Sequence, residues 1–538
     1  MTAPVFLFAA AAALAQTPQP GSQPACIIEG QVVNSVSGAP VRRVTVTVRT
    51  AKNRDHSRAA ETDSTGNFRF QDVPPGGYTL LGERSGYEGQ EYGARSPRVP
   101  GTLVECKSGG PVSGLVFKLT PQATVRGTAL DDEGEPAGGG TVFLLKQVYT
   151  RGRRQLTQKT QANVGGTGEY VLSSISPGRY FLKAGCPSAA ATAQSTEAEA
   201  TEGCAPAYYP NSLDPAEAAP IELRPGDDVR GIDIRLGKTR LFHIRGTVIR
   251  ETGEPAPKAS VKLAVADPTS LSFTRGLTAI ARPPGGSFEI RSVPPGAYVL
   301  NAQTPHGDPQ KENAVMLVDV LDRDIDGLAV VLHSLFPVPG RLRFDESPPE
   351  KLEGITVALE PEDSFLLGWS QAPVDPDGSF LLKDVQPGRF RVKVYGAPES
   401  AFLKSVRHGP RDAAAGVVDL SAGGGGLLEV VLSAGGARVE GVVSDSNGDP
   451  LAGAIVTLHP KSGRPDLYRR ATADRAGRFQ IAGIAPGDYS LSAWEDVEEE
   501  VEQDPEFVRR SESYAKSVSF GESARETVQL RAVPGESR

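Results

Sequence analysis

The chain has 538 residues, with 60 glycines, 44 prolines and a formal net charge of -8 at pH 7. This length is too great for one hydrophobic core and predicts several domains, and so much glycine and proline is typical of short strands joined by tight turns. The charged residues are spread along the chain, with no basic stripe and no Lys/Arg cluster. This distribution argues against nucleic acid as a partner.

The N-terminal segment 1–15 is apolar and ends in Ala13-Leu14-Ala15. It is too short to span a membrane, and its small terminal residues fit a signal-peptidase site, so we expect a secretory signal peptide at 1–15. No later stretch reaches about 18 consecutive apolar residues, so no transmembrane segment is predicted in the mature chain. The expected location is secreted or periplasmic, in the cell envelope.

One motif recurs five times along the chain. A glycine is followed two residues later by an aromatic residue, and a second ring stands ten residues after the first, just behind a Pro-Gly pair, as in Gly66-Asn-Phe68 and Pro75-Gly76-Gly-Tyr78. The ring pairs are Phe68/Tyr78, Tyr170/Tyr180, Phe288/Tyr298, Phe380/Phe390 and Phe479/Tyr489. The repeat therefore predicts five structurally related units of roughly a hundred residues each.

Each copy of the motif has a local physical interpretation. Apolar side chains two residues apart, as in Phe68-Arg-Phe70, lie on one face of a strand, which predicts one buried face. The preceding glycine and the Pro-Gly pair supply the backbone that tight turns need. We therefore expect strand, turn, strand in every copy, with both rings in one core.

The rest of each unit is also built from short strands. A strand whose third residue is glycine opens the unit, an alternating strand such as Val44-Thr-Val46-Thr-Val48 follows, and a strand such as Leu115-Val-Phe117-Lys-Leu119 closes it. About seven strands in a hundred residues indicate an antiparallel β-sandwich. The predicted fold is all-β, with five tandem sandwiches at 24–121, 122–239, 240–335, 336–436 and 437–538.

Two segments depart from this pattern. Residues 187–220 form a long insert in the second unit, and residues 494–513 form an acidic insert in the fifth. In the acidic insert, Asp504-Pro505-Glu506 resembles a helix N-cap with proline at the first helical position, which predicts a short helix.

The four cysteines, an even number, suggest disulfides in an oxidising compartment. Cys26 precedes the first strand of unit one and Cys106 lies near its last strand, so this pair is placed to clip the sandwich. Cys186 and Cys204 bracket part of the insert and are placed to close it. Lipid attachment at Cys26 is the alternative interpretation of that residue.

The opening strand with glycine, the Gly-x-Pro turn that follows it in four units, the Gly-x-Phe strand and the Pro-Gly-x-Tyr-x-Leu strand together resemble the carboxypeptidase regulatory-like domain. The resemblance covers all five units and is weakest in unit four, which has Phe390 in place of tyrosine and Ser347-Pro348-Pro349 in place of the Gly-x-Pro turn. It implies a transthyretin-like sandwich of the carbohydrate-binding-like group. It does not imply an activity, since such domains accompany many unrelated proteins.

No catalytic motif accompanies these domains. The six histidines are isolated, and none begins the His-Glu-x-x-His pattern of a zinc peptidase. Asp375-Pro-Asp377-Gly378 resembles the start of a calcium loop, but Gln386 stands where the bidentate glutamate is needed, so a hairpin turn is the better interpretation. We therefore predict a protein that is not an enzyme and that needs no cofactor or metal.

Binding is the function that remains. Carbohydrate-binding sandwiches stack sugars on exposed rings. The rings outside the predicted core are Tyr87, Tyr92, Tyr208, Tyr209, Trp369 and Trp494. The last four are the candidate ligand-binding residues, and we expect Tyr208 and Tyr209, beside a proline in the long insert, to be the most exposed pair. The leading hypothesis is a non-catalytic envelope protein that binds polysaccharide. The alternatives are a structural stalk or scaffold that contacts another envelope protein, and an enzyme with an unrecognised site.

Overall fold

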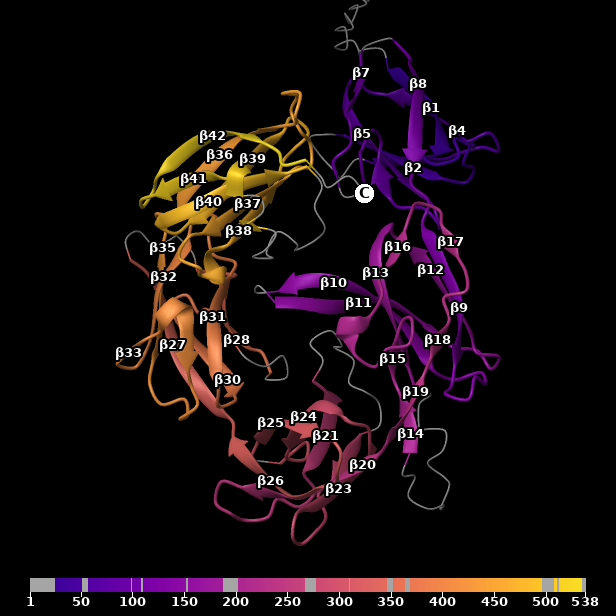
Figure 1. Cartoon of the computed structure of the whole chain (residues 1–538). Coiled ribbons are helices and arrows are strands. Elements are labelled where there is room, and N and C mark those ends of the chain that lie inside the picture. Colours follow the sequence, from indigo (N-terminus) through magenta and orange to yellow (C-terminus); the bar gives the residue numbers. More distant parts are fainter. Residues whose placement is uncertain are drawn as a thin grey trace, which may run out of the picture. The chain divides into compact units, whose positions relative to one another are not determined.

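The computed structural model describes residues 25–50, 57–97, 99–107, 110–150, 153–186, 202–266, 277–308, 310–345, 352–362, 368–495, 508–509 and 512–534. These residues form short strands arranged in small sheets (Figure 1). The chain divides into two compact units, residues 1–97 with 101–120, and residues 98–100 with 121–538. We use the names sandwich 1 to sandwich 5 for groups of strands that share one buried cluster. The predicted signal peptide 1–15 lies outside the described residues.

Sandwich 1 pairs a sheet of order β4-β1-β8 with a sheet of order β3-β2-β5-β6, in which β7 also pairs with β5. Its strands are β1 (Cys26–Asn34), β2 (Thr45–Thr50), β3 (Ser57–Glu61), β4 (Asn67–Val73), β5 (Gly76–Glu83), β6 (Gln90–Glu91), β7 (Val104–Cys106) and β8 (Val112–Leu119).

Sandwich 2 contains two sheets. One has the order β12-β9-β17, and β18 also pairs with β9. The other has the order β11-β10-β13-β15, and β16 also pairs with β13; β14 and β19 form a separate two-stranded ribbon. Its elements are β9 (Ala123–Leu130), β10 (Thr141–Thr150), β11 (Arg153–Asn163), β12 (Glu169–Ile175), β13 (Gly178–Gly185), β14 (Glu202–Ala205), β15 (Ala207–Tyr208), a 3₁₀ turn at Pro215–Glu217, β16 (Ile221–Leu223), β17 (Asp228–Val229), β18 (Ile234–Arg235) and β19 (Gly237–Arg240).

Sandwich 3 differs in that its strands form one continuous sheet of order β22-β21-β24-β25-β26-β20-β23, because β25 pairs with both β24 and β26. The strands are β20 (Phe242–Arg250), β21 (Ser260–Val265), β22 (Thr278–Ile280), β23 (Ser287–Val293), β24 (Gly296–Gln303), β25 (Glu312–Val320) and β26 (Ile325–Ser334).

Sandwich 4 pairs the sheet β30-β27-β35-β32-β33 with the sheet β29-β28-β31-β34. Its elements are β27 (Phe336–Phe344), β28 (Thr356–Pro361), β29 (Ser370–Pro373), β30 (Ser379–Val385), β31 (Arg389–Tyr395), β32 (Phe402–His408), β33 (Arg411–Asp412), a 3₁₀ turn at Ala414–Gly416, β34 (Val417–Asp419) and β35 (Leu428–Ser433).

Sandwich 5 pairs the sheet β39-β36-β42 with the sheet β38-β37-β40-β41. Its elements are β36 (Ala437–Ser444), β37 (Ile455–Pro460), a 3₁₀ turn at Pro465–Leu467, β38 (Arg469–Thr472), β39 (Arg478–Ile484), β40 (Gly487–Trp494), a 3₁₀ turn at Glu512–Tyr514, β41 (Lys516–Phe520) and β42 (Arg525–Arg531). Most of the predicted acidic helix lies outside the described residues. Among the described residues, no helix is long and apolar enough to cross a membrane.

These sheets confirm the predicted all-β sandwich fold, and the motif rings form its core. All ten rings are at most 6% exposed. The residue boundaries between the sandwiches stay a prediction.

The opening strand of each sandwich begins two residues earlier than predicted, so its glycine is the fifth residue, and the strand pairing shows why glycine stands there. Register pairs this glycine with the first motif ring, as in Gly30 with Phe68 and Gly441 with Phe479. A Cβ on Gly30 would lie 2.7 Å from the Leu115 side chain and 3.0 Å from the Phe68 ring. A real side chain would therefore clash with the closing strand or displace the ring.

A shared irregularity follows the first ring. The residue before the β-branched position has a positive φ in every copy: Asp72 (52°), Ser174 (58°), Ser292 (56°), Asp384 (53°) and Gly483 (63°). The register with the opening strand shifts at the same place in every sandwich, which marks a β-bulge. Only the fifth copy fills this left-handed position with the residue that adopts it without strain.

Two disulfides join the predicted cysteine pairs. Cys26 and Cys106 are bonded with a Cα–Cα distance of 6.1 Å, and Cys186 and Cys204 with a distance of 5.8 Å. Both pairings are confirmed. The first bond occupies the Cys26 thiol, which a lipid anchor at the same residue would need.

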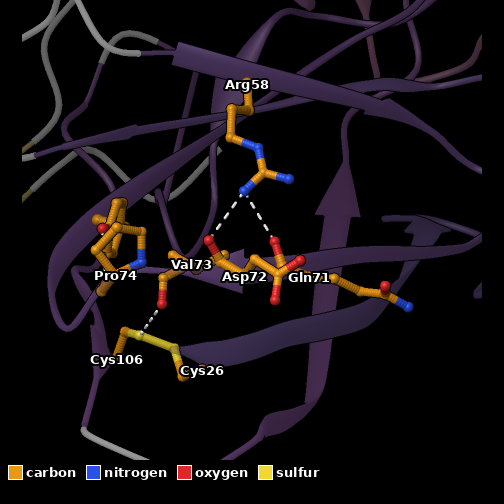
Figure 2. Close-up of a disulfide and its surroundings, with 8 residues drawn as sticks. Cys26, Arg58, Gln71, Asp72, Val73, Pro74 and Cys106 are labelled. Carbon is orange, nitrogen blue, oxygen red and sulfur yellow. Dashed lines mark hydrogen bonds between the residues drawn. A yellow bond between two sulfur atoms is a disulfide. The ribbon is translucent and has the colours of Figure 1, made fainter. Parts of the chain in front are cut away.

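The Cys26–Cys106 bond lies beside the bulge of sandwich 1, as Figure 2 shows. The Cys106 sulfur is 3.5 Å from the Val73 carbonyl oxygen, and Arg58 Nη1 donates to the Gln71 carbonyl at 2.8 Å and to the Asp72 carbonyl at 3.2 Å. The disulfide and the guanidinium therefore both contact the irregular end of β4.

The second ring of the motif makes one further contact. In four sandwiches the tyrosine hydroxyl donates to the backbone carbonyl four residues earlier, at 2.8 to 2.9 Å: Tyr78 to Pro74, Tyr180 to Ser176, Tyr298 to Pro294 and Tyr489 to Ala485. Sandwich 4 has Phe390 at this place and lacks the hydroxyl. The bond fixes the Pro-Gly turn to the strand that follows it.

Replacing Tyr298 with phenylalanine is expected to lower the free energy of unfolding of sandwich 3 by about 1 kcal/mol at neutral pH, because the Pro294 carbonyl loses its donor. Burial raises the pKa of Tyr298 to about 12, against about 10 in an unfolded chain. Above about pH 10 the unfolded state loses a proton that the folded state keeps, so stability falls as the pH rises toward 12.

Tyr298→Phe should remove the part of the fall in unfolding free energy at alkaline pH that the Tyr298 hydroxyl contributes. Urea unfolding of both proteins at about pH 8 and pH 11 measures it, with hydrogen exchange of sandwich 3 peptides as the local readout. Tyr514→Phe, at a ring that is 56% exposed, is the control. An equal fall in stability with pH for Tyr298→Phe and the parent chain would contradict the assignment.

Candidate functional site

No metal-binding cluster is present in the part of the chain that the structure describes. No three His, Cys, Asp or Glu side chains there lie close enough together to hold a metal ion. Burial lowers the pKa of His459 to about 4, and its ring lies 4.9 Å from the Tyr468 ring, so it remains neutral at ordinary pH. The predicted Asp375 loop is a hairpin turn, in which the Ser379 amide donates to the Asp377 carboxylate at 3.0 Å.

Tyr208 does not lie on the surface, so the expectation that its ring is exposed is wrong. It is 6% exposed and forms β15, which pairs with β13. The ring packs with Leu145 and Phe181, and the Lys183 amino group lies 5.4 Å from its centroid. Tyr209 is half-buried against the core of sandwich 2. Both rings therefore attach the described end of the insert to its own sandwich.

Trp494 is also buried, at 4% exposed, although strand alternation correctly places it away from the core rings. Its indole Nε1 donates to the Thr457 hydroxyl at 3.1 Å. Thr457 and Ser492 on the same outer face are 0% and 5% exposed, so this face of the sheet is itself covered. Trp494 therefore offers no ring face to a ligand.

Trp369 is the candidate ring that the structure leaves exposed, at 63%. It directly precedes β29, whose residues alternate between buried and exposed, so Trp369 shares the outer face with Gln371. Register pairs Ser370 with Leu359 on β28, which places Trp369 beside Glu360. Trp369 therefore stands at one end of the outer face of the sheet β29-β28-β31-β34.

Tyr395 lies on the same outer face at the end of β31 and is 44% exposed. Its hydroxyl donates to Glu360 Oε1 at 2.8 Å, and partial burial together with this carboxylate raises its pKa to about 12. We call the surface formed by Trp369, Tyr395, Glu360, Gln371 and Lys393 the Trp369 face. From strand spacing and rise, the Cα atoms of Trp369 and Tyr395 are roughly 16 Å apart, and the Tyr395 hydroxyl reaches back toward Trp369 as far as Glu360.

Sequence reasoning missed Tyr395 and Glu360. Alternation in Phe390-Arg-Val392-Lys-Val394-Tyr395 places Tyr395 on the face opposite the core ring Phe390, so the signal was present. The contact with Glu360 depends on the pairing of β28 with β31, which a single strand does not reveal.

The repeated sheets place this chain in the class of tandem β-sandwich proteins. Residues 27–114 and 438–528, about a third of the chain, match the carboxypeptidase regulatory-like domain family. The match confirms the resemblance at sandwich 1 and sandwich 5. No curated protein matches the chain significantly.

Several solved structures align with the chain at low identity. GBS52, the minor pilin of Streptococcus agalactiae, aligns at 12% identity over 39% of this chain and 95% of its own, with a TM-score of 0.23. The Bacillus anthracis TIE protein aligns at 12% identity over 73% and 68%, with a TM-score of 0.15. BcpA, the major pilin subunit of Bacillus cereus, aligns at 11% identity over 57% and 99%, with a TM-score of 0.16. These scores are too low to bear on function.

Proposed function

We propose that this chain is a non-catalytic, extracytoplasmic protein that binds polysaccharide through the Trp369 face of sandwich 4. The observation that carries the proposal is the exposure of Trp369, at 63%, on a sheet face where Tyr395 is 44% exposed. Flat aromatic faces stack on the apolar faces of sugar rings, while an exposed amide such as that of Gln371 binds hydroxyls. The two disulfides support a location outside the cytoplasm.

The placement of Trp369 and Tyr395 favours a ligand longer than one sugar. Their Cα atoms are roughly 16 Å apart, so an oligosaccharide segment lying along the sheet face would contact both side chains. The hydrogen bond from Tyr395 to Glu360 fixes the tyrosine ring before a ligand arrives, which lowers the ordering cost of binding.

Trp369→Ala is expected to weaken retention on the polysaccharide about tenfold, because loss of one stacked ring costs about 1 kcal/mol or more. The mature chain is first tested by pull-down on insoluble polysaccharides and on a glycan array. Tyr514→Ala, at an equally exposed ring in sandwich 5, should bind like the parent chain. Equal binding by Trp369→Ala and the parent would move the site elsewhere.

Fluorescence gives a second readout of the same site. The chain has two tryptophans, and Trp494 is 4% exposed, so an aqueous quencher should act almost entirely on Trp369. A bound glycan should protect Trp369 from acrylamide. Unchanged quenching at saturating glycan would contradict a site on this face.

A structural stalk or scaffold is the second candidate, and the short joints between sandwiches support it. One residue, Leu335, separates β26 from β27, and Leu241 alone separates β19 from β20. Such joints leave too little chain for a flexible linker. Absence of binding to every glycan, together with capture of an envelope protein, would favour this function.

A further inference from the structure

A cavity of about 470 Å³ lies where sandwich 4 adjoins the sheet β39-β36-β42 of sandwich 5. Its walls come from both sandwiches: the loop between β31 and β32 on one side, and on the other the starts of β36 and β42 with the second half of β39. The volume falls within the range of about 300–1,000 Å³ that small-molecule sites occupy. None of the residues of the Trp369 face lines this cavity, so it is a separate candidate site.

Direct contacts hold the two sandwiches together around the cavity. Both belong to the same compact unit, and only residues 434–436 separate β35 from β36. The Gly436 amide in this joint donates to the Ser400 carbonyl at 3.0 Å. Lys404 of sandwich 4 also forms an ion pair with Glu522 of sandwich 5 at 2.9 Å. The two walls of the cavity are therefore joined by contacts within the described chain.

Two arginines that are far apart in the sequence stand side by side in the cavity wall. Arg438 on β36 pairs in register with Arg525 on β42, and the strands are parallel, so both side chains leave the same face of the sheet. Arg525 is exposed and has no ion pair among the described residues. Arg438 Nη2 donates to Gln480 Oε1, but its Nε atom is buried without a hydrogen bond in the described chain. Adjacent guanidinium groups repel each other, and an anion bound between them would remove that repulsion.

The charge of the cavity wall suits a ligand with one negative charge. Of the lining residues, Arg438 and Arg525 are cationic and Glu399 is acidic, which leaves one positive charge. Glu440, outside the lining, approaches Arg438 Nε only to 3.6 Å, beyond hydrogen-bond distance. Guanidinium groups match the planar geometry of a carboxylate and can bind it through two parallel hydrogen bonds. A carboxylate therefore fits this wall better than a phosphate dianion.

The remaining polar groups of the cavity suit hydroxyl groups. Glu399 and Ser400 come from sandwich 4, and Gln480 and Ser523 come from sandwich 5. The serine hydroxyls and the amide both donate and accept hydrogen bonds, and the carboxylate accepts them. Gln480 Nε2 lies 3.5 Å from Glu399 Oε1, so polar groups of the two sandwiches face each other. The other lining residues are three alanines and one glycine, whose small size leaves room for a sugar ring.

We propose that this cavity binds a small carboxylate that also carries hydroxyl groups, of the uronic acid class, with the carboxylate held by Arg438 and Arg525. Its hydroxyl groups bind the serine, amide and carboxylate groups of the remaining wall. Because both sandwiches contribute to the wall, a bound ligand bridges sandwich 4 and sandwich 5 and favours the arrangement in which they are in contact. The site does not depend on the polysaccharide binding proposed for the Trp369 face.

Titration of the mature chain with galacturonic acid, followed by ligand-observed NMR, tests this site, with galactose as the uncharged comparison. All titrations use the Trp369→Ala chain, so that stacking on the Trp369 face does not contribute. Galacturonic acid should bind at least about tenfold more tightly than galactose, and Arg525→Gln should remove about tenfold of that affinity, because each change removes charge-assisted hydrogen bonds. Arg478→Gln, at an exposed arginine of the same sheet outside the cavity, is the control and should leave the affinity unchanged.

A second variant fills the cavity without changing a charge. Ala482→Leu, at a half-buried position of the lining, should weaken binding of galacturonic acid about tenfold or more while the urea midpoint of sandwich 5 stays close to that of the parent. Equal affinity for galactose and galacturonic acid, or unchanged binding by Arg525→Gln or Ala482→Leu, would overturn the proposal. So would absence of binding, or tighter binding of inorganic phosphate than of galacturonic acid, which would assign the two arginines to a phosphate ligand.

Discussion

Gly441→Val is expected to lower the free energy of unfolding of sandwich 5 by about 3 kcal/mol or more. A Cβ on Gly441 would run into the Val528 carbonyl oxygen of the closing strand and lie 3.0 Å from the Phe479 ring. Neither neighbour can move easily, because Val528 is held in the sheet by the parallel pairing of β36 with β42 and Phe479 is packed in the core. A valine side chain would therefore separate β42 from β36 or force the Phe479 ring out of its rotamer.

The chain offers a matched control and a natural probe for this measurement. Gly521 lies in the same sandwich with open space around the position of its Cβ, so Gly521→Val should cost about 0.5 kcal/mol or less. Buried Trp494 reports on sandwich 5 once Trp369 is replaced by phenylalanine. Equal urea midpoints for Gly441→Val and Gly521→Val in that background would refute the packing argument.

Replacing both Cys26 and Cys106 with serine is expected to cost sandwich 1 about 4–5 kcal/mol, the largest effect of any double substitution considered. The bond closes a loop with a sequence separation of 80, and the chain-entropy model gives this magnitude for such a loop. The two sulfurs are also buried, with Cys26 1% and Cys106 4% exposed. Serine hydroxyls there would need new hydrogen-bond partners.

The second disulfide is the internal comparison. Its sequence separation is 18, for which the same model gives about 3 kcal/mol. Cys186→Ser with Cys204→Ser should therefore weaken sandwich 2 less and leave sandwich 1 unchanged, as hydrogen exchange of peptides from residues 26–119 would show. A sandwich 1 that exchanges as slowly without its disulfide as with it would contradict the entropic account.

The core was predictable from the sequence because one local rule repeats in it. The ring positions, the glycine of the opening strand and the Pro-Gly turn all follow from alternation and turn chemistry, and each recurs five times. The bulge at Asp72 and at the equivalent positions was not predicted, because aspartate and serine indicate a left-handed backbone conformation much less strongly than glycine does.

The candidate site was less predictable than the core. Alternation says only that Trp369, Trp494 and Tyr395 point away from the core rings. Whether such a side chain meets water depends on what covers the outer face, and that differs between Trp494, which is 4% exposed, and Trp369, which is 63% exposed. Which chain segments cover a sheet face depends on contacts between residues distant in sequence. The sequence therefore identified aromatic residues outside the core but wrongly ranked Tyr208 above Trp369 as an exposed ring.

The two disulfides also change what a protease can achieve. A single cut anywhere between Cys26 and Cys106, or between Cys186 and Cys204, leaves both new ends covalently attached through the bond. The nicked chain would remain one covalent molecule and would separate into fragments only after reduction. In an environment rich in secreted proteases, these two stretches can therefore be cleaved without the release of any part of the protein.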